Sequence, residues 1–477
     1  MKSTCLRQKL QTFAHSLLFC TMLAGCGTGV LQHSQNFAPQ APQSTTVQLR
    51  IGDAPADQVF AFEVTIASPI NLIPQSGGPA AAITVDPNRL ELTRTAGKMQ
   101  PISVMALQPG SYSAAEITIQ HPSLTYAKTL LMPNPVTLID SVDGADQTVR
   151  INFNPPLVVG TDPVVLNLDV DLASALVSGS GGSILGTHFT ESSFKIGVQP
   201  VGIAGHQQDD DGEFESVTGR AVEVTTGGFV LQTGQTGSRL PFTVDGSTVF
   251  PSGLGLADLQ NRLIEIQGFT RSDGTLYTKD IEMLGDQSAS QIEGTLTTIG
   301  FNAPTLMEFI AQDGAGTGFT SAQVGQDFLT DISAVPSASF IADFGDCDEA
   351  ALPAPAANFP FDAAHLKGGQ RVEIITESGV RQSQPIIASQ VRLQQQAISG
   401  TVSNFATLPG GASNFDLQLP ADSYVTLLSG QTTVHVIGQS GTDNRAGSFG
   451  NGDAVRVRGP LFWTGTQFNM VARRITE

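Results

Sequence analysis

Short segments in which apolar and polar residues alternate recur along this chain, and they limit the possible folds more than any other feature. Residues 47–51 and 166–172 both follow this pattern. Successive side chains of a β-strand point to opposite faces, so a period of two is typical of a strand with one buried face. Many of the 50 glycines and 27 prolines separate such segments, as in turn-rich β-proteins. The sequence therefore predicts an all-β fold.

The first predicted domain covers residues 46–205. Further strand-like segments occur here at close intervals, which favours a β-sandwich: residues 60–66, 102–105, 115–120, 135–139 and 148–153. Residues 107–112, Leu-Gln-Pro-Gly-Ser-Tyr, read as a turn followed by a strand.

That turn resembles the corner of transthyretin-like and carboxypeptidase-regulatory sandwiches. Together with a turn at residues 53–57 and the alternating run at 166–172, residues 46–203 also resemble a family of uncharacterised domains at the N-terminus of bacterial envelope lipoproteins. The resemblance implies a fold and a location in the cell envelope, and it implies no activity.

Three related units follow an acidic linker at residues 206–215. Each begins with a β-forming residue, a polar residue and a glycine, and these glycines are Gly219, Gly294 and Gly400. Later in each unit a charged residue stands between β-formers: Glu265, Glu373 and Arg456. We expect three small OB-like β-barrels over residues 216–287, 291–396 and 398–477, with a loop insertion at 333–361. The repeated frame resembles an uncharacterised repeat domain of secreted bacterial proteins.

The start of the chain has the organisation of an export signal. Three basic residues precede a mostly apolar run at residues 13–23, which is the length of a signal-peptide core and too short to span a bilayer. The sequence Leu23-Ala24-Gly25-Cys26 then resembles the bacterial lipobox. The resemblance implies that residues 1–25 are removed between Gly25 and Cys26, and that Cys26 carries lipid. The alternative is a plain secretory signal with a chance cysteine.

Lipidation of Cys26 would anchor the chain to a membrane through residues 26–45, which read as a flexible tether. Gly27 stands where an aspartate would signal retention in the inner membrane, so the resemblance implies an outer-membrane location. Removal of the signal would leave only Cys26 and Cys347. A lipidated Cys26 would then exclude an intrachain disulfide, and Cys347 alone cannot form a thiolate metal site.

The charge balance excludes one class of partner. The 43 acidic residues outnumber the 24 Lys and Arg, which gives a formal net charge of −19. Nucleic-acid binding needs a basic surface, because contacts between cationic side chains and phosphates provide much of its affinity. We therefore expect no nucleic acid among the partners.

Candidate chemical groups are few. Asp169 and Asp171 would share one face of a strand, where they could bind calcium or serve acid–base chemistry, or simply be solvated. Four acidic residues in the predicted loop insertion raise the same choice between a weak calcium site and a solvated loop: Asp343, Asp346, Asp348 and Glu349. No other cofactor is expected.

Three further residues are candidates for ligand binding. Trp463 precedes a predicted hairpin turn, where it would either stack on a sugar ring or pack over the end of a barrel. Arg456 and Arg458 share a predicted strand face, where they would pair with an acidic ligand or face water.

These features lead to three hypotheses. The first is a lipid-anchored, non-enzymatic envelope protein for binding, adhesion or assembly, with protein or glycan partners. The second is a cryptic carboxylate-dependent hydrolase of envelope or extracellular glycans, and the third is a passive structural spacer. Under each, the chain would face either the periplasm or the cell exterior.

Overall fold

A computed structural model describes residues 44–54, 56–85, 89–95, 99–130, 136–201, 213–233, 238–300, 305–316, 318–319, 323–342, 359–377, 379–380, 384–408 and 412–477. The chain divides into Met1–Pro42 and one compact unit, Gln43–Glu477, and only the latter is described below. Strands account for most of it, so the predicted all-β class is confirmed. The two α-helices of the described ranges are short, and no helix there is long and apolar enough to cross a membrane: α1 (Leu172–Ala175) and α2 (Tyr424–Ser429).

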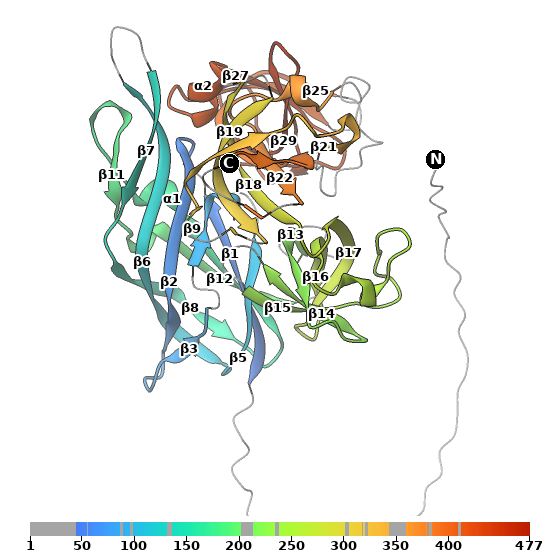
Figure 1. The fold of residues 1–477 in the computed structure, drawn as a ribbon. Helices are drawn as coiled ribbons and strands as arrows, with labels where there is room; N and C mark the ends of the chain where they lie inside the picture. Colours follow the sequence, from blue (N-terminus) through green and yellow to red (C-terminus); the bar gives the residue numbers. More distant parts are fainter. Residues whose placement is uncertain are drawn as a thin grey trace, which may run out of the picture. The chain divides into compact units, whose positions relative to one another are not determined.

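The N-terminal domain is a β-sandwich (Figure 1). One sheet has the order β12-β9-β1-β5; the other has the order β3-β2-β6-β7, with β4 on β2 and β8 on β6. The strands are β1 (Thr45–Ala54), β2 (Val59–Pro74), β3 (Ala81–Ile83), β4 (Arg89–Glu91), β5 (Gln100–Leu107), β6 (Gly110–Leu130), β7 (Val136–Asp143), β8 (Gln147–Val159), β9 (Val164–Asp171) and β12 (Phe194–Pro200). A separate hairpin pairs β10 (Leu176–Ser178) with β11 (Ile184–Thr187).

Alternation explains how the two sheets meet. Leu49 and Ile51 of β1, and Ile117 and Ile119 of β6, are buried in one shared apolar core. The predicted turn and following strand are present at residues 107–112, where β5 gives way to β6, and the Tyr112 hydroxyl donates a hydrogen bond of 2.6 Å to the carbonyl oxygen of Gln108. This bond fixes the entry of the chain into β6, the longest strand of the sandwich.

The first barrel unit is a closed five-stranded barrel of order β13-β14-β15-β17-β16. The third barrel unit closes in the same order, β25-β26-β27-β30-β29, because β29 also pairs with β25. Their strands are β13 (Glu213–Val222), β14 (Gly228–Thr233), β15 (Ser238–Thr243), β16 (Leu263–Thr270), β17 (Leu276–Gly285), β25 (Gln395–Thr407), β26 (Ser413–Gln418), β27 (Thr433–Ile437), β28 (Asp443–Asn444), β29 (Ala454–Trp463), β30 (Phe468–Val471) and β31 (Arg474–Thr476).

The second barrel unit repeats this order with its fifth strand in two pieces. Its strands are β18 (Ser290–Ile299), β19 (Leu306–Ala315), β20 (Asp327–Asp331), β21 (Phe340–Ala342), β22 (Arg371–Thr376), β23 (Ile386–Ile387) and β24 (Gln390–Leu393). β23 pairs with β20 and β24 pairs with β22, while only Ala388 and Ser389 separate the two pieces. In all three units the third and fifth strands therefore run parallel.

The repeated glycine of each unit lies where two strands approach closely. A Cβ atom at Gly400 would lie 2.5 Å from the carbonyl oxygen of Gln418, on the neighbouring strand. A Cβ at Gly219 or Gly294 would meet a carbonyl oxygen of the second strand in the same way. Because such contacts fall well inside van der Waals distance, the absence of a side chain allows the first two strands to pair here.

Replacing Gly400 by alanine should therefore destabilise the third barrel unit. We expect Gly400→Ala to lower the free energy of unfolding by about 1–3 kcal/mol, because the backbone must shift to accept the Cβ. Gly197→Ala is the matched control, since Gly197 also lies in a strand but a Cβ there would meet nothing within 4 Å. Urea denaturation of both variants would test this, and equal losses of stability would contradict it.

Part of the outer face of the β2–β6 sheet is covered by other units of the chain. Phe60 and Ala61 of β2 and Ala127 of β6 form an apolar cluster with Ile310 of β19, and Leu427 and Leu428 of α2 pack against it. The sandwich therefore contacts both the second and the third barrel units, and charged residues gather around these contacts.

Candidate functional site at the junction of the β units

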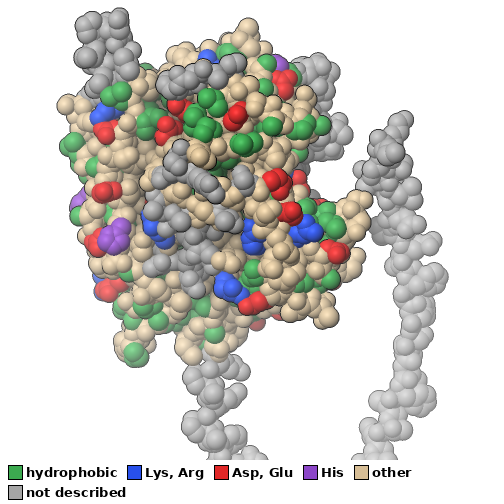
Figure 2. Space-filling model, in the orientation of Figure 1, with side chains coloured by type: hydrophobic (Ala, Val, Ile, Leu, Met, Phe, Trp, Pro, Cys, Tyr) green, Lys and Arg blue, Asp and Glu red, His purple; other side chains and the backbone are tan. Residues whose placement is uncertain are grey.

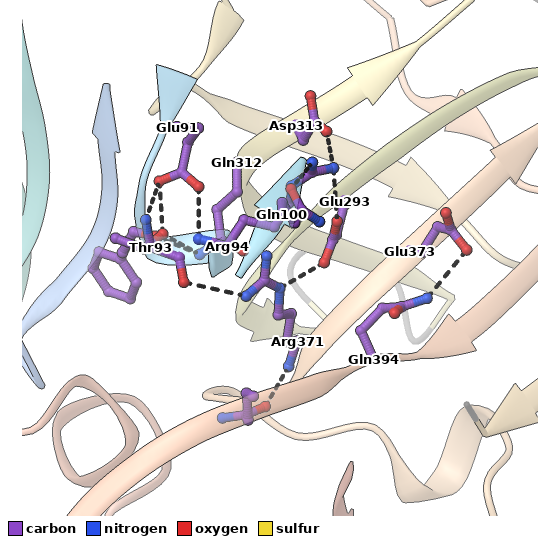
Figure 3. A network of polar contacts seen from close by, with 12 residues as sticks. Glu91, Thr93, Arg94, Gln100, Glu293, Gln312, Asp313, Arg371, Glu373 and Gln394 are labelled. Carbon is purple, nitrogen blue, oxygen red and sulfur yellow. Dashed lines mark hydrogen bonds and ion pairs between the residues drawn. The ribbon is translucent and has the colours of Figure 1, made fainter. Parts of the chain in front are cut away.

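A buried polar network joins the sandwich to the second barrel unit (Figure 3). Arg94 lies in the 3-10 turn η1 (Thr93–Thr95), which follows β4. Its guanidinium pairs with Asp313 of β19 and donates to Gln100 Oε1 at 2.8 Å. Nearby, Arg371 Nε of β22 lies 2.7 Å from Glu293 Oε1 of β18. Two guanidiniums from different domains thus face carboxylates inside one interface.

Glu91 completes this network from the sandwich side. It accepts hydrogen bonds from the backbone N–H of Phe62 at 2.9 Å and from the Thr93 hydroxyl at 2.6 Å. Burial raises the pKa of Glu91 to about 7, although these hydrogen bonds and the charge of Arg371 act in the opposite direction. The network therefore contains one carboxyl group that changes its protonation state near neutral pH.

A second charged cluster joins the first and second barrel units around Arg392 of β24. Its side chain is 2% exposed, and it contacts Glu282 Oε1 at 2.6 Å and Glu265 Oε2 at 3.3 Å, both in the first unit. Glu373, from its own unit, lies 3.0 Å away and is equally buried. Burial alone would lower the pKa of Arg392, but the three carboxylates raise it above its usual value. Arg392 is therefore a permanent cation between two barrels.

The connection between these barrels is also fixed. Arg220 of β13 donates from Nη1 to the carbonyl oxygen of Gln287 at 3.1 Å and from Nη2 to that of Ala289 at 2.8 Å. Both acceptors lie in the segment between β17 and β18. The two barrels are thus held both through Arg392 and through their linking segment.

The third barrel unit is attached to the sandwich through Asp57. Its carboxylate accepts from the Ser399 N–H at 3.2 Å, and its carbonyl oxygen accepts from the Tyr424 N–H at 2.7 Å. Burial raises the pKa of Asp57, while Ser399 and the charge of Arg456 lower it in part. A cavity of about 20 Å³ lies beside it, bounded also by Arg371 and Gln312. That is room for about one water molecule.

Two of the candidate residues from the sequence, Asp169 and Arg456, lie near this junction. Asp169 lies on β9 opposite Lys195 of β12, and it is half-buried. Burial raises the pKa of Asp169, whereas the charges of Lys195 and Arg456 lower it and that of Asp171 raises it. Arg456, from the third barrel unit, therefore lies close enough to act on Asp57 and Asp169 of the sandwich, and its Nε lies 3.4 Å from the Ser399 hydroxyl.

Asp171 has a local structural role. It is the N-cap residue of α1, and its carboxylate accepts a hydrogen bond of 3.1 Å from the Ser174 N–H. Such a cap satisfies a backbone donor at the start of a helix. Asp169 and Asp171 thus lie on one strand face as predicted, but their carboxylates have different partners.

The other predicted ligand-binding residues are packed against neighbours. Trp463 packs edge to face on Phe468 at 5.2 Å, and Lys367 Nζ lies 5.0 Å from the centre of its ring. Arg458 is 5% exposed, so it does not lie on a wet strand face. Gly465 adopts the φ of 92° that the predicted hairpin turn requires.

The predicted calcium ligands Asp343, Asp346, Asp348 and Glu349 lie outside the described residues. Within the ranges that are described, no group of three or more His, Cys, Asp or Glu side chains is placed to hold a metal ion.

A larger cavity of about 450 Å³ lies between the outer face of the β2–β6–β7 sheet and residues 324–326 of the second barrel unit. Its lining is mainly polar, with hydroxyls from Ser123, Thr125 and Ser141. Nothing in the sequence pattern pointed to this groove, because its two sides are about 200 residues apart in the chain.

The charged residues at the interfaces were not predicted as a site, although the sequence contains a feature that could have indicated them. Glu265, Glu373 and Arg392 each stand alone among β-formers, in Leu-Ile-Glu-Ile, Val-Glu-Ile and Val-Arg-Leu. A single charge in a strand whose neighbours are all apolar indicates a second interface on that face. Charged side chains are seldom buried unless they are paired, so each such residue also implies a partner.

Comparison with known proteins adds no family to this description, because neither the protein-family models nor the curated proteins contain a match to the chain.

Removing Arg392 should disrupt the junction of the first two barrels. Arg392→Met leaves Glu265 and Glu373 buried without their cation, and loss of one partner of a buried pair costs about 3–5 kcal/mol. The control is Arg150→Met, because Arg150 pairs with Glu116 in solvent and such pairs contribute less than about 1 kcal/mol. We expect a much lower urea midpoint for the first variant alone, and similar midpoints would refute a structural role for the cluster.

Glu91 should make stability depend on pH. Its pKa rises on folding from an ordinary value of 4.5 to about 7, so the folded chain holds its proton more tightly. That contribution is fully present below pH 4.5 and is lost as the pH rises through about 7. Between pH 4 and 8 we expect the wild type to lose up to about 3 kcal/mol more than Glu91→Gln. Parallel pH profiles of the two proteins would contradict this, and Glu116→Gln, at an exposed site, serves as the control.

Proposed function

We propose that this chain is a lipid-anchored bacterial envelope protein that binds protein or glycan partners without catalysing a reaction. The sequence Leu23-Ala24-Gly25-Cys26 supports the lipid anchor, and the polar segment after it supports a tether. On this proposal, Cys26 holds the chain at the outer membrane, and the β units form the part that meets the partner.

The observation that carries the proposal is the use of charge at the junctions. Arg94 of the sandwich pairs with Asp313 of the second barrel unit. Arg392 of the second unit pairs with Glu265 and Glu282 of the first, and both arginine side chains are largely buried. Pairs of this kind hold the sandwich and barrel units in one arrangement. A fixed arrangement of four β units offers a partner surfaces that no single unit has, and preorganised surfaces bind more tightly.

The anchor is tested by removing its sulfur. Cys26→Ser should abolish labelling with radioactive palmitate and move the protein from the membrane fraction to the soluble fraction, because the acyl chains are lost. Cys347→Ser is the matched control, since Cys347 is the other cysteine beyond the predicted signal, and it should keep both label and location. Palmitate that persists in Cys26→Ser would defeat the proposed anchor.

Binding is tested by crosslinking the full-length protein in intact cells, followed by purification and mass spectrometry. We expect one reproducible protein or glycan partner that is lost in Cys26→Ser, because the unanchored chain no longer meets it at the membrane. A passive spacer would be favoured if no partner is crosslinked. It would also be favoured if the same species is crosslinked at equal yield to a control variant whose exposed residues have been shuffled. Protease treatment of whole cells would show which side of the outer membrane the β units face.

A further inference from the structure

We propose that the groove between the β2–β6–β7 sheet and the second barrel unit binds a short uncharged carbohydrate. The inference rests on the proposed binding function and names its ligand class. The groove holds about 450 Å³, within the range of roughly 300–1,000 Å³ that is usual for small-molecule sites. It also lies between two domains, which is a common position for such sites.

The floor of the groove is a polar patch on an otherwise core-forming sheet. Strand register places Glu63, Ser123 and Asp143 in one row across β2, β6 and β7. Thr125 and Ser141 form the next row on the same face. Phe62 and Leu124, between these rows in sequence, point to the opposite face and are buried in the sandwich core. The alternation of the strands thus separates a hydroxyl- and carboxylate-bearing floor from the apolar core beneath it.

The wall of the groove is held in place by the backbone of residues 323–326. Gly325 has a φ of 74°, and a Cβ there would come 2.5 Å from Thr125 Oγ1. Thr125 donates to the Gly325 carbonyl oxygen at 3.2 Å, while the Gly325 N–H donates to Ala311 at 2.8 Å. The groove is therefore already formed without a ligand, which reduces the entropic cost of binding.

The charges of the lining favour a neutral ligand over an anion. Glu63 is paired with Arg89, so Asp143 leaves the lining with a formal charge of −1 when His121 is neutral. Charged side chains on the face in Figure 2 are likewise interspersed, and acidic ones are common. Ser123 and Ser141 carry hydroxyls that can both donate and accept hydrogen bonds. Sugar hydroxyls have the same dual capacity, and a carboxylate such as Asp143 accepts from them strongly.

The test uses an array of neutral di- and trisaccharides, followed by calorimetric titration of the best binder with the full chain. Ser141→Tyr should weaken binding at least tenfold, because Ser141 is exposed at the floor and a tyrosine ring would occupy the groove. Thr148→Tyr is the matched control, since Thr148 is exposed on β8 of the same sheet outside the groove lining. Asp143→Asn should weaken binding about tenfold without filling the groove. Thermal melts of all three variants should match the wild type.

Three outcomes would overturn the inference: no neutral sugar on the array binds, binding is unchanged in Ser141→Tyr, or Ca²⁺ alone binds with the same dependence on Asp143. None of these outcomes contradicts the proposed function, which is contradicted only if crosslinking in cells yields no partner. If a partner is crosslinked but no sugar on the array binds, the chain is a binding protein whose site lies outside this groove.

Discussion

The arrangement of the β units depends on buried guanidinium–carboxylate pairs, above all those of Arg392. A cation in this interface requires nearby carboxylates, and Glu265, Glu282 and Glu373 come from two different barrels. Apolar contacts alone tolerate sliding of one sheet over another, because burial has little directional preference. A planar guanidinium donates hydrogen bonds to carboxylates only in certain directions, so it also fixes the register of the interface. The same argument applies to Arg94 of the sandwich, which pairs with Asp313 of the second barrel unit.

In each barrel unit, the same strand position carries a charged residue that faces a neighbouring unit or strand, but the sign of the charge differs between units. Ile264, Val372 and Val455 pair with the repeated glycines Gly219, Gly294 and Gly400, and the next residue in each unit is charged. In the first two units that residue is a glutamate, and both glutamates face Arg392. In the third it is Arg456, whose charge acts on Asp57 and Asp169 of the sandwich. One frame thus provides opposite charges for different neighbours.

Much of the fold follows from local pattern. The predicted strands at residues 47–51, 60–66 and 115–120 all lie within observed strands, because alternation and turn residues act over short distances. Contacts between units were harder to foresee. Residues 59–64 are buried without interruption, since β2 has the sandwich core on one face and the second and third barrel units on the other. An alternating pattern indicates a single buried face, so it cannot predict a strand that is buried on both faces. The partners of Glu91 and Arg392 depend on packing between segments that are distant in the sequence.

The attachment of Asp57 to Ser399 and Tyr424 affects the order in which the chain can fold as it is synthesised. These bonds join residues more than 340 positions apart, so the sandwich cannot make its final contacts until the third barrel unit has been synthesised. Until then, Leu427 and Leu428 do not cover the apolar outer face around Phe60 and Ala127. Exposed surface of that kind promotes aggregation, and loops this long close slowly. The apolar patch around Phe60 and Ala127 is therefore most open to aggregation in the interval before the third barrel unit has folded onto it.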